Sequence, residues 1–230
     1  MVNLKEYIKE GLFDDLDKIE KIGGMESNVK LLKKEITDWI TNNTYTLIIK
    51  SRLEFDFNTT PITVNYDDDI YISKSVTSLN DNGLFQWGEV GGGFYCTECK
   101  LLKSLEGAPK EVGGDFNCFY CPSLKTLEGS PGKVGNDFAC NHCKLLKTLK
   151  GAPKDVGGYF NCSYCESLKS LEGCPKEVGW YFNCSYCGNL KSLKSAPKEV
   201  GRDFYCSNCG TQFSEEDVKK VTNVKRYIYC

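Results

Sequence analysis

Six Cys-x-x-Cys pairs are the residues of this 230-residue chain whose type and spacing are best suited to chemistry. They recur every 22 residues without insertion or deletion. Two such pairs separated by eighteen residues have the spacing of a structural zinc site, in which four thiolates surround the metal. The zinc ligands would then be the twelve cysteines of these pairs: Cys96, Cys99, Cys118, Cys121, Cys140, Cys143, Cys162, Cys165, Cys184, Cys187, Cys206 and Cys209.

The residues between the cysteines repeat in the same register and favour a different interpretation. A phenylalanine stands two residues before each pair, as Phe94 does before Cys96, and leucines, a proline and a valine follow in phase. A solenoid needs each of these positions, because every coil buries the same inward set against its neighbours, whereas a zinc site does not. We therefore expect most cysteines to be small buried hydrophobic residues, and we expect no cofactor; zinc and disulfides are the alternatives.

The spacing also predicts the shape of each coil. Phe-x-Cys alternates with period two, so both side chains point to one face of a short strand and the residue between them points to the other. The steps of three that follow suit a corner, and the Gly-x-Pro stretch is too short for a helix. We expect one strand, a bend, an extended back side and a glycine turn per coil, with strands of successive coils paired in parallel.

The repeat Phe-x-Cys-x-x-Cys-x-x-Leu-x-x-Leu resembles the core of leucine-rich repeats, Leu-x-Leu-x-x-Asn/Cys. The short coil is similar to the 22-residue type found in bacterial effectors and in proteins of large tailed phages. The resemblance implies a right-handed, mainly β solenoid with about six regular coils and degenerate caps. It also implies that the second cysteine of each pair bonds to backbone groups of the turn.

The ends of the chain predict caps on this solenoid. Residues 3–22 and 27–42 have helical periodicity, and residues 44–57 and 62–66 are typical of two strands joined by a hairpin turn. We expect residues 1–68 to form a small α+β cap and residues 69–213 the solenoid, with Tyr71 aligned on Phe94 in a degenerate entry coil. Residues 214–230 would close the stack with a helix capped at Ser214 and a last strand at Ile228.

The N-terminus carries a second, shorter resemblance. Ile8-Lys9-Glu10 followed by Gly11 is similar to the capsid-targeting peptide of internal head proteins in T-even-type phages, which the prohead protease cuts after such a glutamate. The resemblance implies processing between Glu10 and Gly11. The same residues also fit an amphipathic helix with a charged face.

Catalysis, membrane insertion and nucleic-acid binding have little support in the sequence. The one histidine, His142, lies between two cysteines, but neighbouring side chains on a turn diverge, and no phosphate loop or activated serine is present. No apolar run approaches membrane-spanning length, and the N-terminus lacks the apolar segment of a signal peptide. A row of lysines along the coils is compensated by rows of acidic residues, so we expect no nucleic-acid partner.

The outward positions of the strands vary while the inward ones do not, which is how repeat proteins present a binding surface. We predict a non-enzymatic module that binds a host or viral protein, located in the host cytoplasm or in a phage virion. The alternatives are a virion head protein and a zinc-stabilised scaffold. The predicted binding surface comprises Tyr95, Asn117, Phe119, Tyr159, Asn161, Trp180, Tyr181, Asn183 and Tyr205.

Overall fold

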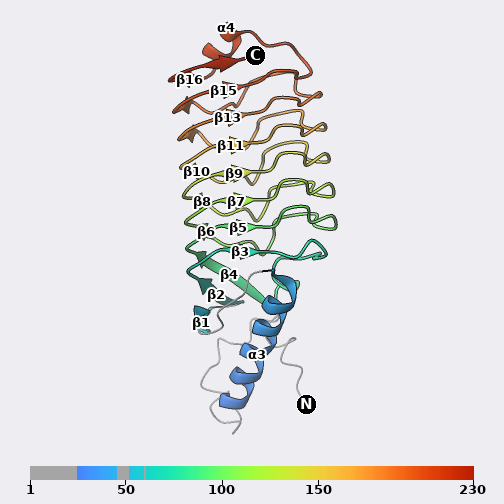
Figure 1. Ribbon diagram of the computed structural model, residues 1–230, viewed down its shortest axis with the longest axis vertical. Helices are drawn as coiled ribbons and strands as arrows, with labels where there is room; N and C mark the ends of the chain where they lie inside the picture. The colour runs from blue at the N-terminus through green and yellow to red at the C-terminus, as the bar shows by residue number, and fades with distance from the viewer. Residues whose placement is uncertain (1–24, 46–51, 60) are drawn as a thin grey trace.

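The computed structural model describes residues 25–45, 52–59 and 61–230, and it shows a column of stacked coils (Figure 1). The chain winds through about eight turns, and each turn adds one short strand to an eight-stranded parallel sheet. The fold is therefore the mainly β solenoid that the repeats predict. The first predicted helix, residues 3–22, and the Glu10–Gly11 bond lie outside the described residues.

The eight-stranded sheet contains the Phe-x-Cys segments. Its strands are β3 (Ile70–Tyr71), β5 (Phe94–Tyr95), β7 (Phe116–Asn117), β9 (Phe138–Ala139), β11 (Phe160–Asn161), β13 (Phe182–Asn183), β15 (Phe204–Tyr205) and β17 (Ile228–Tyr229). In the six regular coils each phenylalanine is aligned with the next one, 22 residues later. The constant register places every inward position of one coil directly over its equivalent in the coil below.

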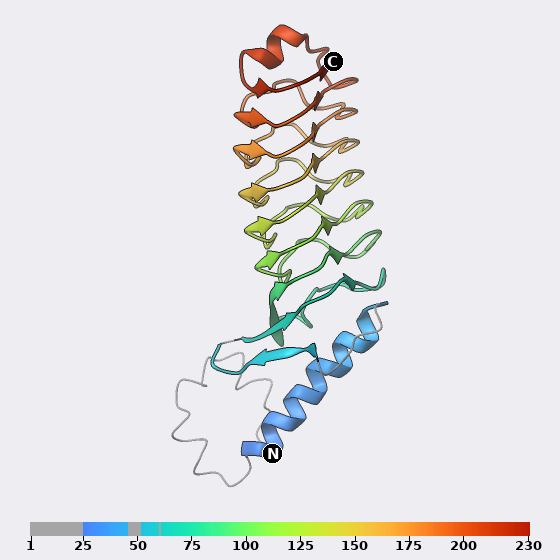
Figure 2. The ribbon, with the colours of Figure 1, turned by 60° about the vertical axis from the view of Figure 1, so that its left-hand side comes forward.

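A second parallel sheet runs beside the first and corrects the prediction of one strand per coil. Its strands are β1 (Glu54–Asp56), β2 (Ile62–Tyr66), β4 (Phe85–Val90), β6 (Glu111–Val112), β8 (Lys133–Val134), β10 (Asp155–Val156), β12 (Glu177–Val178), β14 (Glu199–Val200) and β16 (Asn223–Val224). The valines that recur every 22 residues thus lie on strands. In each of these strands the valine is buried and the charged residue before it is exposed, as in Glu111–Val112 and Glu177–Val178. Figure 2 shows the two sheets meeting along the column.

A column of glycines makes the corner between the two sheets. Each valine strand from β4 to β14 ends at a glycine such as Gly157, and a Cβ atom there would collide with the carbonyl oxygen of Gly135 in the preceding coil; after β16 the equivalent residue is Lys225. The same collision recurs at Gly135, Gly179 and Gly201. Glycine is therefore required because the backbones of successive coils approach too closely for any side chain.

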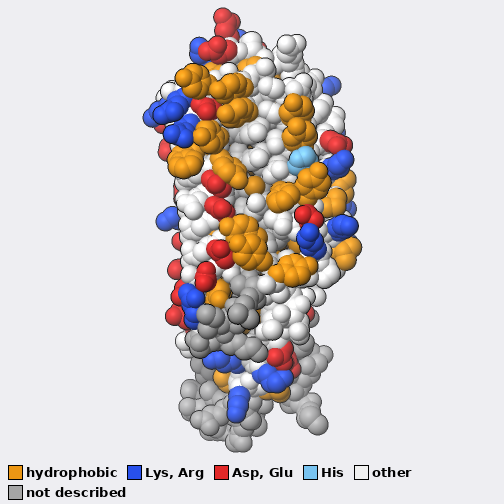
Figure 3. Space-filling view, viewed as in Figure 1, with side chains coloured by type: hydrophobic (Ala, Val, Ile, Leu, Met, Phe, Trp, Pro, Cys, Tyr) orange, Lys and Arg blue, Asp and Glu red, His pale blue; other side chains and the backbone are white. Residues whose placement is uncertain are grey.

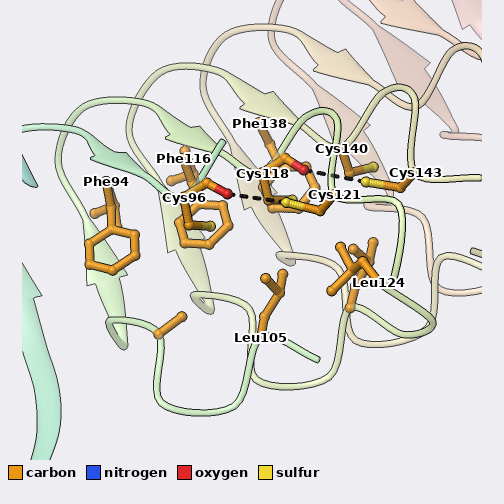
Figure 4. Packing of buried hydrophobic residues seen from close by; sticks show 14 of the residues in the cluster. Phe94, Cys96, Leu105, Phe116, Cys118, Cys121, Leu124, Phe138, Cys140 and Cys143 are labelled. Carbon is orange, nitrogen blue, oxygen red and sulfur yellow. Dashed lines mark hydrogen bonds between the residues drawn. The ribbon is translucent and has the colours of Figure 1, made fainter. Parts of the chain in front are cut away.

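The core is a set of columns, one for each inward position of the repeat. The phenylalanine rings of successive coils stack with centroids 5.0–5.7 Å apart, and all six are fully buried. Cysteine and leucine columns fill the space beside them, as Figure 4 shows for residues such as Cys118, Leu105 and Leu124. Eleven of the fourteen cysteines are buried, so most are core residues, as expected, and their small size lets the coil turn tightly after the strand.

The N-terminal segment extends the solenoid instead of capping it as a separate unit. The helix α3 (Met25–Asn43) matches the second predicted helix, and β1 and β2 form the predicted antiparallel hairpin, although β1 is shorter than expected. Strand β2 pairs in parallel with β4, which continues the second sheet. The helix lies at the base of the column (Figure 2), where Trp39 packs edge-on against Phe85 with ring centroids 5.4 Å apart.

The entry coil has a different register from the predicted one. Ile70, not Tyr71, is aligned on Phe94, and both Ile70 and Ile72 are buried. Tyr71 is 42% exposed and stacks on Tyr95, with ring centroids 4.5 Å apart. The period-two pattern of the strand is obeyed with isoleucines inside, because the tyrosine hydroxyl would be left without a partner in this apolar core.

The C-terminal end follows the prediction. The helix α4 (Glu215–Lys219) begins at Ser214, whose hydroxyl accepts a hydrogen bond from the Asp217 N–H while the Asp217 carboxylate accepts one from the Ser214 N–H. Ile228 pairs with Phe204, two residues later than in the regular coils. Within the described part of the chain, no helix is long and apolar enough to cross a membrane.

Candidate interaction surface

The second cysteine of each pair forms a ladder of hydrogen bonds along the solenoid. The Cys121 thiol donates to the carbonyl oxygen of Cys96 at 3.1 Å, and the Cys143 thiol donates to that of Cys118 at 3.3 Å (Figure 4). The same bond recurs from Cys165, Cys187 and Cys209. Each thiol donates a hydrogen bond to a carbonyl that the corner turns away from the sheet. The column of second cysteines therefore stabilises the backbone of the corners.

Many of the thiols have a raised pKa, which favours their neutral form, whereas hydrogen bonding with Cys99 and Cys184 lowers the pKa of Cys121 and of Cys209. Burial raises the pKa of the Cys162 thiol well above its usual value, and burial together with the nearby Cys165 does the same for Cys187. Among the described residues, no group of three or more histidine, cysteine, aspartate or glutamate side chains converges as metal ligands would. The twelve cysteines proposed as zinc ligands are thus placed as two rows of the core, not as separate clusters.

His142 belongs to an exposed column of aromatic rings that the sequence analysis did not identify. It stacks between Tyr120 and Tyr164 with ring centroids 4.4 and 4.5 Å away, and Tyr186 extends the column by 4.4 Å. All four residues have φ between 56° and 59°. The left-handed backbone turns these side chains out of the corner and away from the buried cysteines, so His142 is not paired with them. The recurrence of aromatic residues every 22 residues, between the two cysteines of four successive pairs, could have predicted this column from the sequence.

Five of the predicted surface residues line one shallow hollow on the eight-stranded sheet. It has a volume of about 180 Å³ and is lined by Tyr159, Asn161, Tyr181, Asn183 and Tyr205, together with the backbone of Phe160. These side chains come from three neighbouring strands, β11, β13 and β15, and from the corners that precede them. We call this group of five residues the tyrosine hollow.

Arg202 organises the edge of the tyrosine hollow. Its guanidinium donates a hydrogen bond to the Tyr181 hydroxyl at 3.0 Å and lies over the Trp180 ring, 5.4 Å from the centroid. The Trp180 side chain is nevertheless 51% exposed. Arg202 was not among the predicted residues, because only the stacking of coils brings it beside Trp180, which precedes it by one repeat.

The asparagines of the hollow also have a structural task. The side-chain oxygen of Asn161 accepts a hydrogen bond from the Ser163 N–H at 3.0 Å, and that of Asn183 accepts one from the Ser185 N–H at 2.9 Å. Asn117 forms the same bond with Phe119. These oxygens hold the corner after the strand, so the amide nitrogens are the groups left to face a ligand.

Three of the other four predicted residues, Tyr95, Asn117 and Phe119, lie two or three coils away from the tyrosine hollow, whereas Trp180 lies beside it. Tyr95 stacks on Tyr71, and its hydroxyl lies 3.3 Å from the Asp115 carboxylate to which it donates. Phe119 packs edge-on against Tyr120. The space-filling view shows hydrophobic groups in both regions, with acidic side chains between them (Figure 3). The nine predicted residues are therefore not one site.

The charges on this face differ between its two ends. Asp69, Asp115 and Asp137 line the N-terminal half, and burial raises the pKa of Asp137, whose carboxylate accepts a hydrogen bond from the Tyr159 N–H at 2.8 Å. Asp203 occupies the same repeat position near the C-terminal end, where its carboxylate accepts hydrogen bonds from the Tyr227 N–H and the Tyr205 hydroxyl. Arg202 and Arg226 occupy equivalent corner positions near the C-terminal end, linked by a backbone hydrogen bond. Within the described residues, neither arginine forms an ion pair with a carboxylate.

Comparison with known proteins identifies no relative. No protein-family model, no curated protein and no solved structure matches the chain.

Proposed function

We propose that the chain is a non-enzymatic, leucine-rich-repeat-type module that binds a protein through the tyrosine hollow and the adjacent Trp180 and Arg202. The observation that carries the proposal is the gathering of an exposed tryptophan, three tyrosines and an arginine around one hollow. Tryptophan, tyrosine and arginine are the residues that most often dominate the energy of protein interfaces. The thiol ladder supports the leucine-rich-repeat likeness, because it fills the role of the asparagine or cysteine ladder in that family.

The scaffold suits this role because it limits the entropy that binding costs. The hollow residues stand on strands paired on both sides, and their rings are held by neighbours, as Arg202 holds Tyr181. Side chains that are already ordered lose little rotamer freedom when a partner docks. A rigid aromatic surface of this kind favours one bound geometry.

The charges favour a partner segment that presents a carboxylate beside an apolar side chain. Arg202 keeps further N–H donors beyond the one used by Tyr181, and Arg226 lies one coil above it. An acidic group at this position would gain charge-assisted hydrogen bonds while an apolar neighbour filled the hollow. Asp115 and Asp137, on the N-terminal side of the hollow, would repel the same segment, and Asp203 would keep its carboxylate on the side of Arg202 and Arg226.

The experiment begins with proteins retained from a native host lysate by the immobilised chain. Each retained protein is then purified and titrated alone against the wild type, Trp180→Ala and Tyr181→Ala. We expect each variant to weaken binding by about 30-fold, which corresponds to the loss of roughly 2 kcal/mol at an interface hot spot.

The matched control is Leu101→Ala, which truncates a residue that is 52% exposed but lies outside the hollow. It should leave the affinity unchanged. Arg202→Lys should weaken binding of a carboxylate-bearing segment while preserving the charge. If Trp180→Ala and Leu101→Ala bind every retained protein equally well, the tyrosine hollow is not the binding site.

A further inference from the structure

The sulfurs of Cys206 and Cys230 face each other across the last two coils. Their Sγ atoms lie 3.2 Å apart, at directly opposed positions on the parallel strands that begin with β15 and β17. Elsewhere in the first cysteine row, the Cys162 and Cys184 thiols donate to backbone carbonyl groups. The second row bonds to carbonyl groups as well. The last coil thus brings together two thiols that have each other as partners.

The backbone around this pair already has the arrangement that a bridge requires. The Cys206 N–H donates to the Tyr229 carbonyl at 2.8 Å, and the rings of Tyr205 and Tyr229 stack with centroids 4.6 Å apart. A disulfide joins sulfurs at about 2.05 Å and is compatible with Cα atoms about 5–6 Å apart, as in paired strands. Small side-chain rotations are therefore enough to form the bond.

Exposure distinguishes the two sulfurs and sets the order of events. Cys230 is exposed, whereas Cys206 is 1% exposed. Burial, with the hydrogen bond to Cys230, raises the pKa of the Cys206 thiol. A thiol reacts as its thiolate, and an oxidant must reach it. The exposed Cys230 is therefore the thiol that reacts with the oxidant first, and the buried Cys206 is the one that attacks the resulting mixed disulfide.

We propose that Cys206 and Cys230 form a redox modification site, at which a low-molecular-weight disulfide such as oxidised glutathione installs an intramolecular disulfide between β15 and β17. The Cys230 thiolate attacks one sulfur of oxidised glutathione, breaks its S–S bond and releases one glutathione thiolate. The Cys206 thiol then loses its proton and attacks Cys230 Sγ, which releases the second glutathione. Two protein thiols are oxidised, and one glutathione disulfide is reduced to two thiols.

The bond would close a loop of 24 residues that contains α4 and β16. It would join the last coil covalently to the one below, whose Tyr205 lines the tyrosine hollow. A bridge across such a loop restricts the unfolded chain and so stabilises the folded one. Because each coil contacts only its neighbours, the restraint acts directly against fraying of β17 from β15.

The test treats the full-length protein with oxidised glutathione, alkylates the remaining thiols and digests with trypsin. We expect residues 203–219 to be found joined to residues 227–230, with the loss of two hydrogen atoms. Fragmentation of the joined peptides must assign the bond to Cys206 and not to Cys209, which lies on the same peptide. A Cys209→Ala variant should still form it.

Three variants make the result decisive. Cys230→Ser should remove the joined peptides, and Cys206→Ser should stop at the glutathione adduct on Cys230. Cys174→Ala should behave like the wild type, because Ala152 and Ala196 occupy the same repeat position and the change is structurally neutral. The oxidised wild type should unfold at a higher temperature than the reduced one, and Cys230→Ser should abolish the difference. A wild type that keeps all fourteen thiols, or that joins other cysteines, overturns the proposal.

Discussion

At the scale of single residues, the cysteines of this chain are explained by what their neighbours require. A thiol is small enough for a tight corner, apolar enough for a core of phenylalanine and leucine, and still able to donate one weak hydrogen bond. The second cysteine of each pair uses that donor on the carbonyl of the preceding coil, as Cys143 does with Cys118. Zinc spacing arises as a by-product of the repeat length.

Replacing one donor of the thiol ladder measures its contribution. In Cys143→Ala the buried carbonyl of Cys118 loses its thiol partner, and we expect the free energy of unfolding to fall by about 1–3 kcal/mol. Denaturant titration measures the loss, and Cys143→Ser should recover part of it because the hydroxyl can donate. Cys174→Ala is the control and should change stability little; equal losses in the two alanine variants would contradict the ladder's role.

His142 links the aromatic column to pH. Partial burial between the stacked rings, with the Lys144 charge nearby, lowers the pKa of His142 from its usual value. Between the lowered folded value and the unfolded value of about 6.5, the unfolded chain binds more protons than the folded one. The contribution of the neutral ring to stability is therefore complete above the unfolded pKa and is lost as the pH falls toward the folded pKa.

A tyrosine at this position should remove that dependence, since Tyr120, Tyr164 and Tyr186 already occupy it in other coils. We expect His142→Tyr to gain stability relative to the wild type on going from about pH 7.5 to about pH 5.5. Unfolding curves of both proteins at the two pH values give the comparison. A difference that does not change with pH would show that His142 is not destabilised by protonation.

At the scale of elements, each coil is two short strands joined by a corner at which backbones nearly touch. A Cβ atom at Gly157 would overlap the Gly135 carbonyl oxygen, although the Gly157 N–H must also stay bonded to the Val134 carbonyl at 3.1 Å. The corner therefore cannot move outward without breaking the second sheet. The repeat of glycine predicted a turn there, but only the second sheet explains why a side chain at Gly157 would collide with the preceding coil.

Two glycine substitutions separate this close approach from the general effect of a methyl group. Gly157→Ala should lower the free energy of unfolding by about 1–3 kcal/mol, as overpacking does. Gly188→Ala, where no atom lies within 4 Å of the added Cβ, should stay within about 0.5 kcal/mol of the wild type. Thermal and denaturant unfolding of both variants measure the effect, and comparable losses would rule out the proposed clash.

At the scale of the whole molecule, the solenoid is a linear array whose coils contact only their neighbours. The same sheets run from β1 to β16 and from β3 to β17, and one hydrophobic core extends from Leu32 to Val218. Stability in such an array is close to a sum of coil and interface contributions. The hollow and the C-terminal cysteine pair depend on three or four coils and not on the total length.

Removing one complete coil should therefore be tolerated. Deletion of residues 136–157 joins Gly135 to Gly158 in register and leaves the tyrosine hollow intact. We expect a folded protein with one cooperative transition, a lower free energy of unfolding and unchanged partner binding. Deletion of residues 136–146 removes half a coil, and circular dichroism should show loss of the fold; a folded half-coil variant would contradict a strict 22-residue register.

The sequence by itself determined the repeat, the inward columns, the parallel stacking and both ends of the regular array. The reason is that burial repeats with the period of the coil, so the same apolar residue type recurs at every inward position. Most outward positions vary from coil to coil, and the recurring aromatic residues from Tyr120 to Tyr186 are the exception. The tertiary structure decided five further features. These are the second sheet, the alignment of Ile70 in place of Tyr71, the aromatic column through His142, the packing of Arg202 over Trp180 and the contact of Cys206 with Cys230. Each depends on which residue of one coil lies above which residue of the next, and on where the corner turns the side chain. Only the stacked backbone determines both.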